Sequence, residues 1–385
     1  MLKKIVVKFN IVNILSIPLL LFRIFPIKSN KICFINFSGK DYGDSPKYIS
    51  EKLHELDSNL DLVWLVKNVR NSSAPNYIRL VKYFSLRYFY ELATSRIWIN
   101  NSRFDQFVIK RKNQYYVQTW HGGLAFKKIE YDADEKLSDY YHKVMKHDNK
   151  LMDCMISNGK FCTELYRRGF KYNGDILEFG TPRNDVLIND KMEINQKVRN
   201  FFKISDDDMI LLYAPTFRLD YSKNPYDIDF SRLRVALEKS TKKKWHIFIK
   251  LHPRITNSSE LLNLDDYSKD ISFYPDIQEL ICASNLVITD YSSTMFESMI
   301  ADIPVIIYAN DIDNYIDERG FYFNFNELPF KLSKNNEELE KIIMENELDL
   351  MKGNYLSFEK RVGLIEKGDS CKKICNYLIK NVLNK

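Results

Sequence analysis

Short apolar runs alternate with amphipathic stretches along most of the chain. The first set of runs comprises Ile32–Phe37, Leu60–Val66, Arg96–Asn100, Tyr115–Thr119, Cys154–Ser157 and Ile176–Phe179. The second set comprises Met209–Ala214, His246–Lys250, Ile271–Tyr274, Leu286–Thr289 and Val305–Tyr308. Many of these runs are continuously apolar, as in parallel strands that are buried on both faces. Helical patterns at Pro46–Leu56, Phe161–Arg168 and Ile277–Ala283 separate them, so the pattern predicts an α/β protein with parallel sheets.

A polar, charged stretch from Asn184 to Ser205 lies between the two sets. In a chain of 385 residues, each side of it has the size of one doubly wound domain. We therefore expect two such domains facing each other across a cleft. The expected boundaries are a membrane-associating segment 1–30, an α/β domain 31–185, a linker helix 186–205 and an α/β domain 206–385. The chain contains neither a GxGxxG fingerprint nor a P-loop motif.

The positive charge of the chain is concentrated at its N-terminus. The formal net charge is +6, and the first 40 residues carry seven bases and no acid. Because the bases are mixed with apolar residues at one end, they favour an anionic membrane surface as partner. A nucleic-acid-binding protein usually spreads its bases over a folded domain, so we expect no nucleic acid.

The apolar stretch between Lys8 and Arg23 has 14 uncharged residues and is interrupted by Pro18, so it is short for a membrane-spanning helix. No small-x-small cleavage site follows it, which argues against a signal peptide. The pattern favours a segment lying in the membrane interface, and an ordinary first helix packed on the domain is the alternative. The six cysteines lack metal-ligand spacing, so we expect buried, reduced thiols.

Polar residues that are able to take part in catalysis or ligand binding follow several predicted strands. Ligands bind at these strand ends in open α/β sheets. His121 follows one strand and is able to act as a general base near neutral pH. The alternative is a structural histidine, but the neighbouring glycines and lysines favour a functional turn. This turn contains Trp120, His121, Gly122, Gly123, Lys127 and Lys128.

Cationic residues follow two strands of the second set. Arg218 ends the segment Tyr213–Arg218 and has the fork geometry that clamps a phosphate. Lys250, His252 and Arg254 lie within five residues and offer charge to a pyrophosphate. An exposed arginine and a solvated basic turn are the respective alternatives.

A polar turn follows the strand Leu286–Thr289 and leads into a predicted helix. Asp290, Ser292, Ser293 and Thr294 lie in this turn, where hydroxyls and helix N-terminal amides bind anions. Simple helix capping is the alternative, and it is compatible with phosphate binding.

Taken together, these segments resemble those of the CDP-glycerol glycerophosphotransferases, which prime or polymerise teichoic acid. Seven stretches in order carry the resemblance over roughly residues 30–330: Asp44–Tyr48, Thr119–Gly122, Gly180–Asp185, Tyr213–Arg218, Leu251–Pro253, Thr289–Ser293, and Pro304–Tyr308 with Arg319–Tyr322.

The resemblance implies a two-domain GT-B-type fold that uses no catalytic metal and no cofactor. It also implies transfer of glycerol phosphate from CDP-glycerol to a hydroxyl of a lipid-linked or glycan acceptor, with release of CMP. The two motif histidines of the family fall on His121, expected to be the base, and His252, expected to stabilise the donor pyrophosphate. Such an enzyme would lie at the cytoplasmic face of the membrane as a peripheral protein.

The expected donor-binding residues are Arg218, Lys250, Arg254, Asp290, Ser292, Ser293 and Thr294. The expected acceptor-side residues are Trp120, Gly122, Gly123, Lys127 and Lys128.

The sequence is also compatible with other acceptors, another donor and two other classes of protein. The family more often has Thr-Pro after the WHG turn, where this chain has Gly123-Leu124-Ala125-Phe126, so the acceptor-facing loop is altered. Relatives that use CDP-ribitol share the motifs. A GT-B glycosyltransferase using a nucleotide sugar and an inactive membrane scaffold are the two further alternatives.

Overall fold

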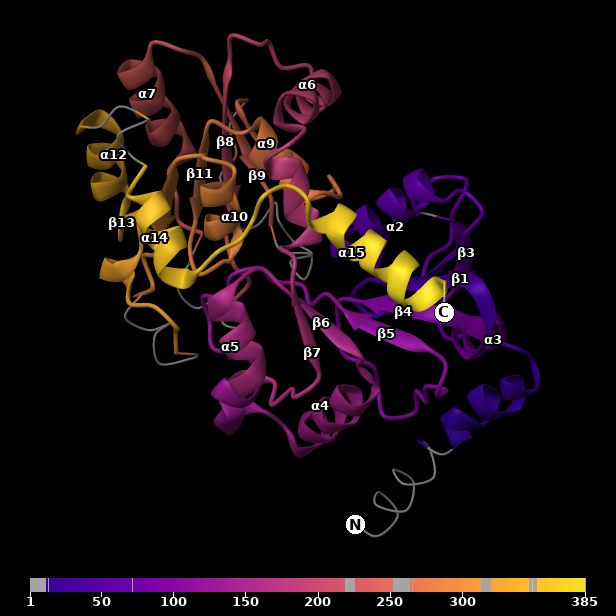
Figure 1. Ribbon diagram of the computed structural model, residues 1–385. Coiled ribbons are helices and arrows are strands. Elements are labelled where there is room, and N and C mark those ends of the chain that lie inside the picture. Colours follow the sequence, from indigo (N-terminus) through magenta and orange to yellow (C-terminus); the bar gives the residue numbers. More distant parts are fainter. Residues whose placement is uncertain are drawn as a thin grey trace. The chain divides into compact units, whose positions relative to one another are not determined.

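The computed structural model describes residues 12, 14–70, 72–218, 226–251, 264, 266–312, 320–345, 348 and 352–384, without the side chains of 134–136. Its contacts divide the chain into two compact units (Figure 1). Unit 1 comprises Met1–His121, Glu130–Arg183 and Ile365–Lys385, and unit 2 comprises Gly122–Ile129 and Asn184–Leu364.

Unit 1 contains a parallel sheet of seven strands in the order β3-β2-β1-β4-β5-β6-β7. Its strands are β1 Lys28–Ile35, β2 Asp61–Val66, β3 Arg79–Lys82, β4 Ser95–Asn100, β5 Tyr115–Gln118, β6 Cys154–Ser157 and β7 Asp175–Glu178. Ile32 pairs with Leu62 on one side and with Ile97 on the other. The strand order reverses between β1 and β4, and at such a switch point α/β sheets bind ligands beyond their carboxyl ends.

The helices of unit 1 are η1 Phe22–Ile24, α2 Asp44–Leu56, α3 Leu86–Thr94, η2 Glu130–Lys136, α4 Asp139–Leu151, α5 Lys160–Gly169, η3 Pro182–Leu187 (which runs across the unit boundary), α15 Ser370–Leu378 and η5 Ile379–Leu383. The C-terminal α15, yellow in Figure 1, packs on α2. Gly180 allows the close approach of α15, because a Cβ there would lie 2.2 Å from Ser370 Oγ. The C-terminal residues thus complete the core of unit 1, in which Ile374 and Leu378 pack with Ile49.

Unit 2 contains a parallel sheet of six strands in the order β10-β9-β8-β11-β12-β13. Its strands are β8 Met209–Ala214, β9 Trp245–Ile249, β10 Ser268–Asp270, β11 Leu286–Thr289, β12 Val305–Tyr308 and β13 Lys331–Ser333. The switch point lies between β8 and β11. The strand ends that carry the predicted donor residues therefore meet there.

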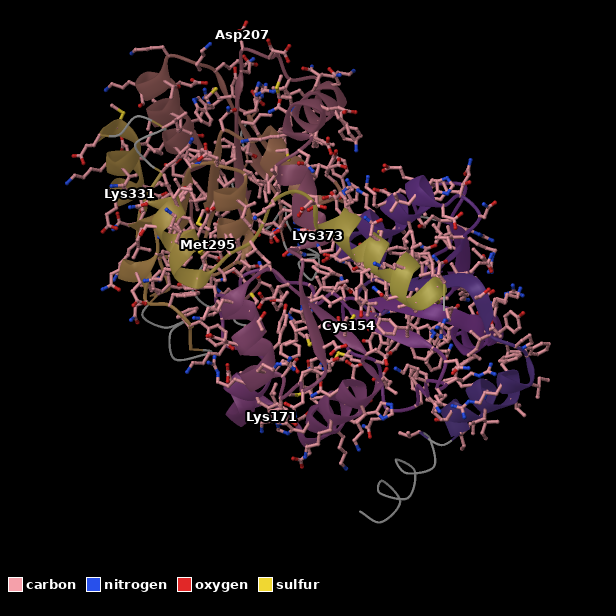
Figure 2. The ribbon with its side chains drawn as sticks, viewed as in Figure 1. Cys154, Lys171, Asp207, Met295, Lys331 and Lys373 are labelled. Carbon is pink, nitrogen blue, oxygen red and sulfur yellow. The ribbon has the colours of Figure 1, made fainter. Side chains whose placement is uncertain are left out.

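The helices of unit 2 are α6 Lys191–Phe202, α7 Phe230–Thr241, α9 Ile277–Ala283, α10 Thr294–Ile300, η4 Phe325–Glu327, α12 Asn336–Glu345 and α14 Tyr355–Val362. The charged stretch expected to be a linker contains α6, which packs on α9 within unit 2. Met295, labelled in Figure 2, is fully buried near the start of α10, and Cys154 is likewise buried on β6 of unit 1.

The predicted parallel α/β architecture is confirmed, with three differences in the strands. The run Ile271–Tyr274 is wrong as a strand, because β10 ends at Asp270 and Ile271 only donates one bond to Ile249. The edge strands β3 and β13 were not predicted, since both are short and begin or end with charged or polar residues. All six cysteines are buried, as expected, and their thiols lie outside disulfide bonds in the described part of the chain.

The compact units also differ from the expected boundaries. Residues Ile365–Lys385 belong to unit 1 instead of unit 2, and Gly122–Ile129 belong to unit 2 instead of unit 1. Both exchanges follow from packing that periodicity does not reveal.

The N-terminal segment is described from residue 12 on, with residues 14–21 helical. Ser16 donates to the carbonyl of Phe107 at 2.9 Å, and Leu19 is buried. Among the described residues, the helices fall short of the length and apolarity required to cross a bilayer.

Candidate active site

The turn after β5 holds Trp120 in a strained backbone conformation. Trp120 has φ of 54°, a left-handed value that a bulky side chain rarely adopts. Its N–H donates to Gln118 Oε1 at 2.9 Å, and its ring packs on Phe170 at 4.8 Å between centroids. Such strain persists only where the surroundings enforce it, and it clusters at functional sites.

A buried charge cluster supports this turn. The guanidinium of Arg103 lies 5.8 Å from the Trp120 ring and 4.7 Å from the Phe170 ring. It donates to Glu130 at 2.7 Å and to Asp148 at 3.1 Å. Because both carboxylates are buried, this cluster fixes the position of Arg103, which lies against the ring of Trp120.

The imidazole of His121 has one defined hydrogen bond. Its Nδ1 lies 2.7 Å from the main-chain oxygen of Asn101, which follows β4. A carbonyl oxygen only accepts, so Nδ1 carries the hydrogen. In the neutral ring Nε2 is then unprotonated and able to accept a proton, which is the state a general base requires.

The surroundings of His121 lower its pKa and so favour the neutral imidazole. Burial lowers the pKa of His121, and it outweighs the bond to Asn101 and the charge of Asp44, both of which raise the pKa. Arg183 lowers it further, and it pairs with Asp44 at 2.7 Å. Asp44 and Arg183 come from two motifs far apart in the sequence. Unit 1 therefore brings three of the predicted motifs together around His121.

The predicted acceptor-side residues divide between the two units. Trp120 and His121 lie in unit 1, whereas Gly122, Gly123, Lys127 and Lys128 lie in unit 2. There Lys127 forms an antiparallel bridge with Phe321, and the N–H of Lys128 donates to the oxygen of Gly320 at 3.1 Å. The short loop is thus folded onto the later 320–322 motif.

In unit 2 the ends of β8 and β11 are joined by Arg218. Its Nη2 donates to Asp290 at 2.8 Å, its Nε donates to Asp311 at 2.7 Å, and its Nη1 donates to the oxygen of Thr216 at 2.8 Å. Arg218 is only 5% exposed, and Tyr291 lies under its guanidinium at 4.8 Å. Most of the donors with which we expected Arg218 to clamp a phosphate thus already have protein partners.

The carboxylate of Asp290 is also occupied by the protein. It accepts bonds from the N–H of Thr216 at 2.9 Å and of Tyr291 at 2.6 Å. The ion pairs with Asp290 and Asp311 outweigh burial and raise the pKa of Arg218. Both residues therefore define the shape of the switch-point loops.

The other predicted donor residues lie at neighbouring strand ends. Lys250, after β9, donates to the main-chain oxygen of Tyr274 at 2.5 Å. Ser292 and Thr294 share a hydroxyl bond of 2.9 Å, and Ser293 is half-buried at the start of α10. His252 and Arg254 lie outside the described residues.

Sequence reasoning missed several residues around the two switch points. Asn36 and Asn101 follow β1 and β4, and Asp311 follows β12 and pairs with Arg218. Consecutive polar residues directly after an apolar strand are the signal that identifies Asn101. Asp311 lies in a loop with no distinctive pattern, so nothing in the sequence singles it out.

Comparison with known proteins agrees with this arrangement. The model of a family described as CDP-Glycerol:Poly(glycerophosphate) glycerophosphotransferase matches residues 18–380. The chain is 31% identical to a teichoic acid poly(glycerol phosphate) polymerase of Bacillus spizizenii, over 98% of this chain and 99% of that one. It is also 31% identical to a teichoic acid glycerol-phosphate transferase of Staphylococcus aureus, over 91% of this chain and 93% of that one.

A solved structure of a variant of the wall teichoic acid polymerase TagF is similar to this one. Its TM-score is 0.84 and its sequence identity 29%, over 98% of this chain and 96% of that one. This likeness confirms the two-domain, GT-B-like fold, and the family match confirms the resemblance drawn from the motifs. The chain belongs to the CDP-glycerol:poly(glycerophosphate) glycerophosphotransferase family.

Proposed function

We propose that this protein transfers glycerol phosphate from CDP-glycerol to a hydroxyl of a lipid-linked or glycan acceptor in teichoic acid synthesis, with release of CMP. The observation that carries the proposal is the state of His121. Its Nδ1–H is bound to Asn101, so Nε2 is available as a base beside the switch point of unit 1. The description of the family indicates CDP-glycerol as the donor, and the names of the relatives indicate teichoic acid as the polymer.

In the proposed reaction Nε2 of His121 accepts the proton of the acceptor hydroxyl. The acceptor oxygen forms a bond to the phosphorus that carries the glycerol. The bond between that phosphorus and the bridging oxygen breaks, and CMP leaves with the electron pair. The imidazolium then loses its proton to solvent. In phosphoryl transfer, positioning and charge stabilisation supply most of the rate enhancement.

The donor is proposed to bind at the switch point of unit 2. Lys250, Ser292, Ser293 and Thr294 lie at the ends of β9 and β11, where hydroxyls and a cation suit a pyrophosphate. His252 is proposed to add charge there, as the family motif implies, and Arg254 is proposed to do so from the cluster of cations in the sequence. Arg218 and Asp290 contribute by holding the loops, since their own groups are largely paired.

We further propose that the protein is peripheral and binds the cytoplasmic face of an anionic membrane through residues 1–30. Ile17, Leu21 and Ile24 recur at helical spacing and are 47%, 64% and 82% exposed. The opposite side of this segment packs on unit 1 through Ser16 and Leu19. An apolar stripe that faces outward among clustered bases suits a lipid interface.

The experiment is a measurement of CMP release by the purified protein with CDP-glycerol, with and without lipid extract containing acceptor. CDP-ribitol and a nucleotide sugar are tested in parallel. We expect lipid-dependent release of CMP from CDP-glycerol. Release from CDP-ribitol instead would change the alcohol that is carried, and turnover of the nucleotide sugar alone would contradict the proposed reaction class.

A further inference from the structure

We propose that Asn101 is a positioning residue for the reaction, because its main-chain carbonyl fixes the tautomer of His121 and its side chain holds Phe37 against the imidazole. The inference rests on the proposed role of His121 as the base. It adds a second element, a strained loop after β1 that restrains the histidine ring.

The side chain of Asn101 connects the loops that follow β1 and β4. Its Oδ1 accepts from the N–H of Phe37 at 2.8 Å, and its Nδ2 donates to Asn36 Oδ1 at 2.6 Å. Asn36 in turn donates to the carboxylate of Asp41. Since a main-chain N–H only donates and a carboxylate only accepts, the orientation of both amides is determined.

This amide chain is buried, which gives it a directional role. Asn101 is fully buried and Asn36 is 2% exposed. Buried amides destabilise the fold unless they are paired, so the loss of one partner disturbs this whole series of hydrogen bonds. The hydrogen-bonded amides therefore fix where the main-chain carbonyl of Asn101 points, and this carbonyl is the partner of His121 Nδ1.

The loop that Asn101 holds is strained. Phe37, Ser38 and Gly39 have φ values of 41°, 54° and 81°, and this left-handed conformation is unfavourable for the first two residues, which carry a Cβ. The N–H of Ser38 donates to Ser102 Oγ at 3.3 Å, so both strained residues are held by the segment after β4. A loop under such strain at a strand end indicates function.

The strained conformation of this loop places the ring of Phe37 beside the imidazole of His121. The Phe37 ring lies 5.1 Å from the ring of His121, and the ring of Trp120 lies 4.1 Å from it. Phe37 is nevertheless 37% exposed, so burial of its ring does not account for the strained loop. Contact with two rings, together with the bond to Asn101, restricts the rotation of His121 and directs Nε2.

The first test observes the imidazole directly in the full-length protein. Labelling with ¹⁵N-histidine gives signals for six histidines, and the signal lost in His121→Asn identifies His121. We expect the wild-type protein to show a protonated Nδ1 and an unprotonated Nε2 in the neutral ring. A neutral ring protonated at Nε2 would overturn the inference, whatever the activity.

The second test compares variants along the amide chain. Asn101→Ala removes both side-chain bonds, Asn36→Ala removes one partner, and Phe37→Leu removes only the ring. The matched control is Asn30→Ala at the other end of β1, whose amide donates to Asn59 at 3.1 Å near the surface. CMP release with CDP-glycerol, the melting temperature and the ¹⁵N spectrum are recorded for each.

We expect Asn101→Ala to lower kcat roughly 10- to 100-fold, with KM for CDP-glycerol nearly unchanged, because a small displacement of the base reduces the rate strongly. The His121 signals should change to a mixture of tautomers, and Phe37→Leu should lower kcat less, without lowering the melting temperature. If Asn101→Ala does not fold, the kcat values and ¹⁵N spectra of Asn36→Ala and Phe37→Leu test the inference in its place. Unchanged kcat and tautomer in these variants would overturn the inference, whereas full activity of His121→Ala would overturn the proposed function instead.

Discussion

The guanidinium of Arg218 and the carboxylate of Asp290 form an ion pair of 2.8 Å that joins the ends of β8 and β11. Both side chains are nearly inaccessible to solvent, at 5% and 3% exposure. The pair therefore belongs to the framework of the switch point in unit 2. Loss of Arg218 is therefore expected to lower the stability of unit 2 as well as its affinity for the donor.

Replacing Arg218 with alanine should destabilise unit 2 and weaken donor binding together. The change leaves two carboxylates, Asp290 and Asp311, without their shared cation in a buried site. The loss of one partner of a buried pair costs about 3–5 kcal/mol. Thermal unfolding and equilibrium binding of CDP-glycerol measure the two effects.

The matched control for this prediction is Arg232→Ala, also in unit 2. Arg232 forms two ion pairs, with Glu337 and Glu340, but it is 40% exposed. Surface pairs contribute little, so the melting temperature and the binding of CDP-glycerol should remain close to wild type. A fall in donor affinity without any loss of stability in Arg218→Ala would instead indicate a direct phosphate contact.

His121→Ala should abolish CMP release and leave CDP-glycerol binding intact, because the imidazole is expected to act on the acceptor. General base catalysis typically contributes 10²–10⁴-fold. Isothermal titration with CDP-glycerol checks the second half of the prediction. A marked loss of donor affinity would show that His121 contacts the donor.

The acid limb of the rate profile should lie below the ordinary pKa of histidine, 6.5. The base works unprotonated, and burial lowers the pKa of His121, so activity falls only as the pH drops through this lowered value. Asp44→Asn removes a charge that raises the pKa, and it should move the midpoint of kcat/KM further down. A midpoint above 6.5, or one that Asp44→Asn does not move, would contradict this assignment.

The buried carboxylate of Glu91 should make unit 1 sensitive to acid. Burial alone would raise its pKa, but hydrogen bonds from Arg79 and Lys31 lower it from 4.5 to about 2. Because the folded-state pKa is depressed, the stabilisation is complete above pH 4.5 and is lost as the pH falls towards 2.

The variant Glu91→Gln tests this dependence. At pH 7 it should lower the free energy of unfolding by about 3–5 kcal/mol, since the buried Lys31 loses its charged partner and Arg79 keeps only Asp61. The difference between wild type and variant should shrink between pH 4.5 and 2, which denaturant unfolding at several pH values measures. A constant difference over this range would mean that Glu91 does not titrate in the expected way.

The strands were the most predictable part of this fold, because β6, β8, β11 and β12 are buried apolar runs with the expected bounds. Their ends then placed the chemistry, since motif residues after parallel strands share one edge of a sheet. His121 and the motif pair Asp44–Arg183 meet in unit 1 for this reason. The edge strand β3 lacks such a run, so its four residues gave no signal.

The roles of individual polar residues were less predictable. The sequence presents Arg218 as a free cation, and only the fold reveals the carboxylate of Asp311 beside it. The return of Ile365–Lys385 to unit 1 depends equally on a long-range contact, that of α15 with α2. Local pattern specifies which residues are buried, but it does not specify their partners across hundreds of residues.

Replacing the outward apolar residues of the N-terminal segment should release the protein from membranes without unfolding it. Ile17, Leu21 and Ile24 are at least 47% exposed, so aspartate is tolerated at these positions in water but not in a lipid interface. Co-sedimentation with phosphatidylglycerol vesicles should fall at least about tenfold for the triple aspartate variant, since each change removes apolar contact and adds repulsion from the anionic surface.

The matched control is Leu356→Asp on α14 of unit 2, which is 70% exposed and should leave vesicle binding unchanged. Equal binding of the wild type and the triple variant would leave the N-terminal helix as an ordinary packed element of unit 1, held by Ser16 and Leu19.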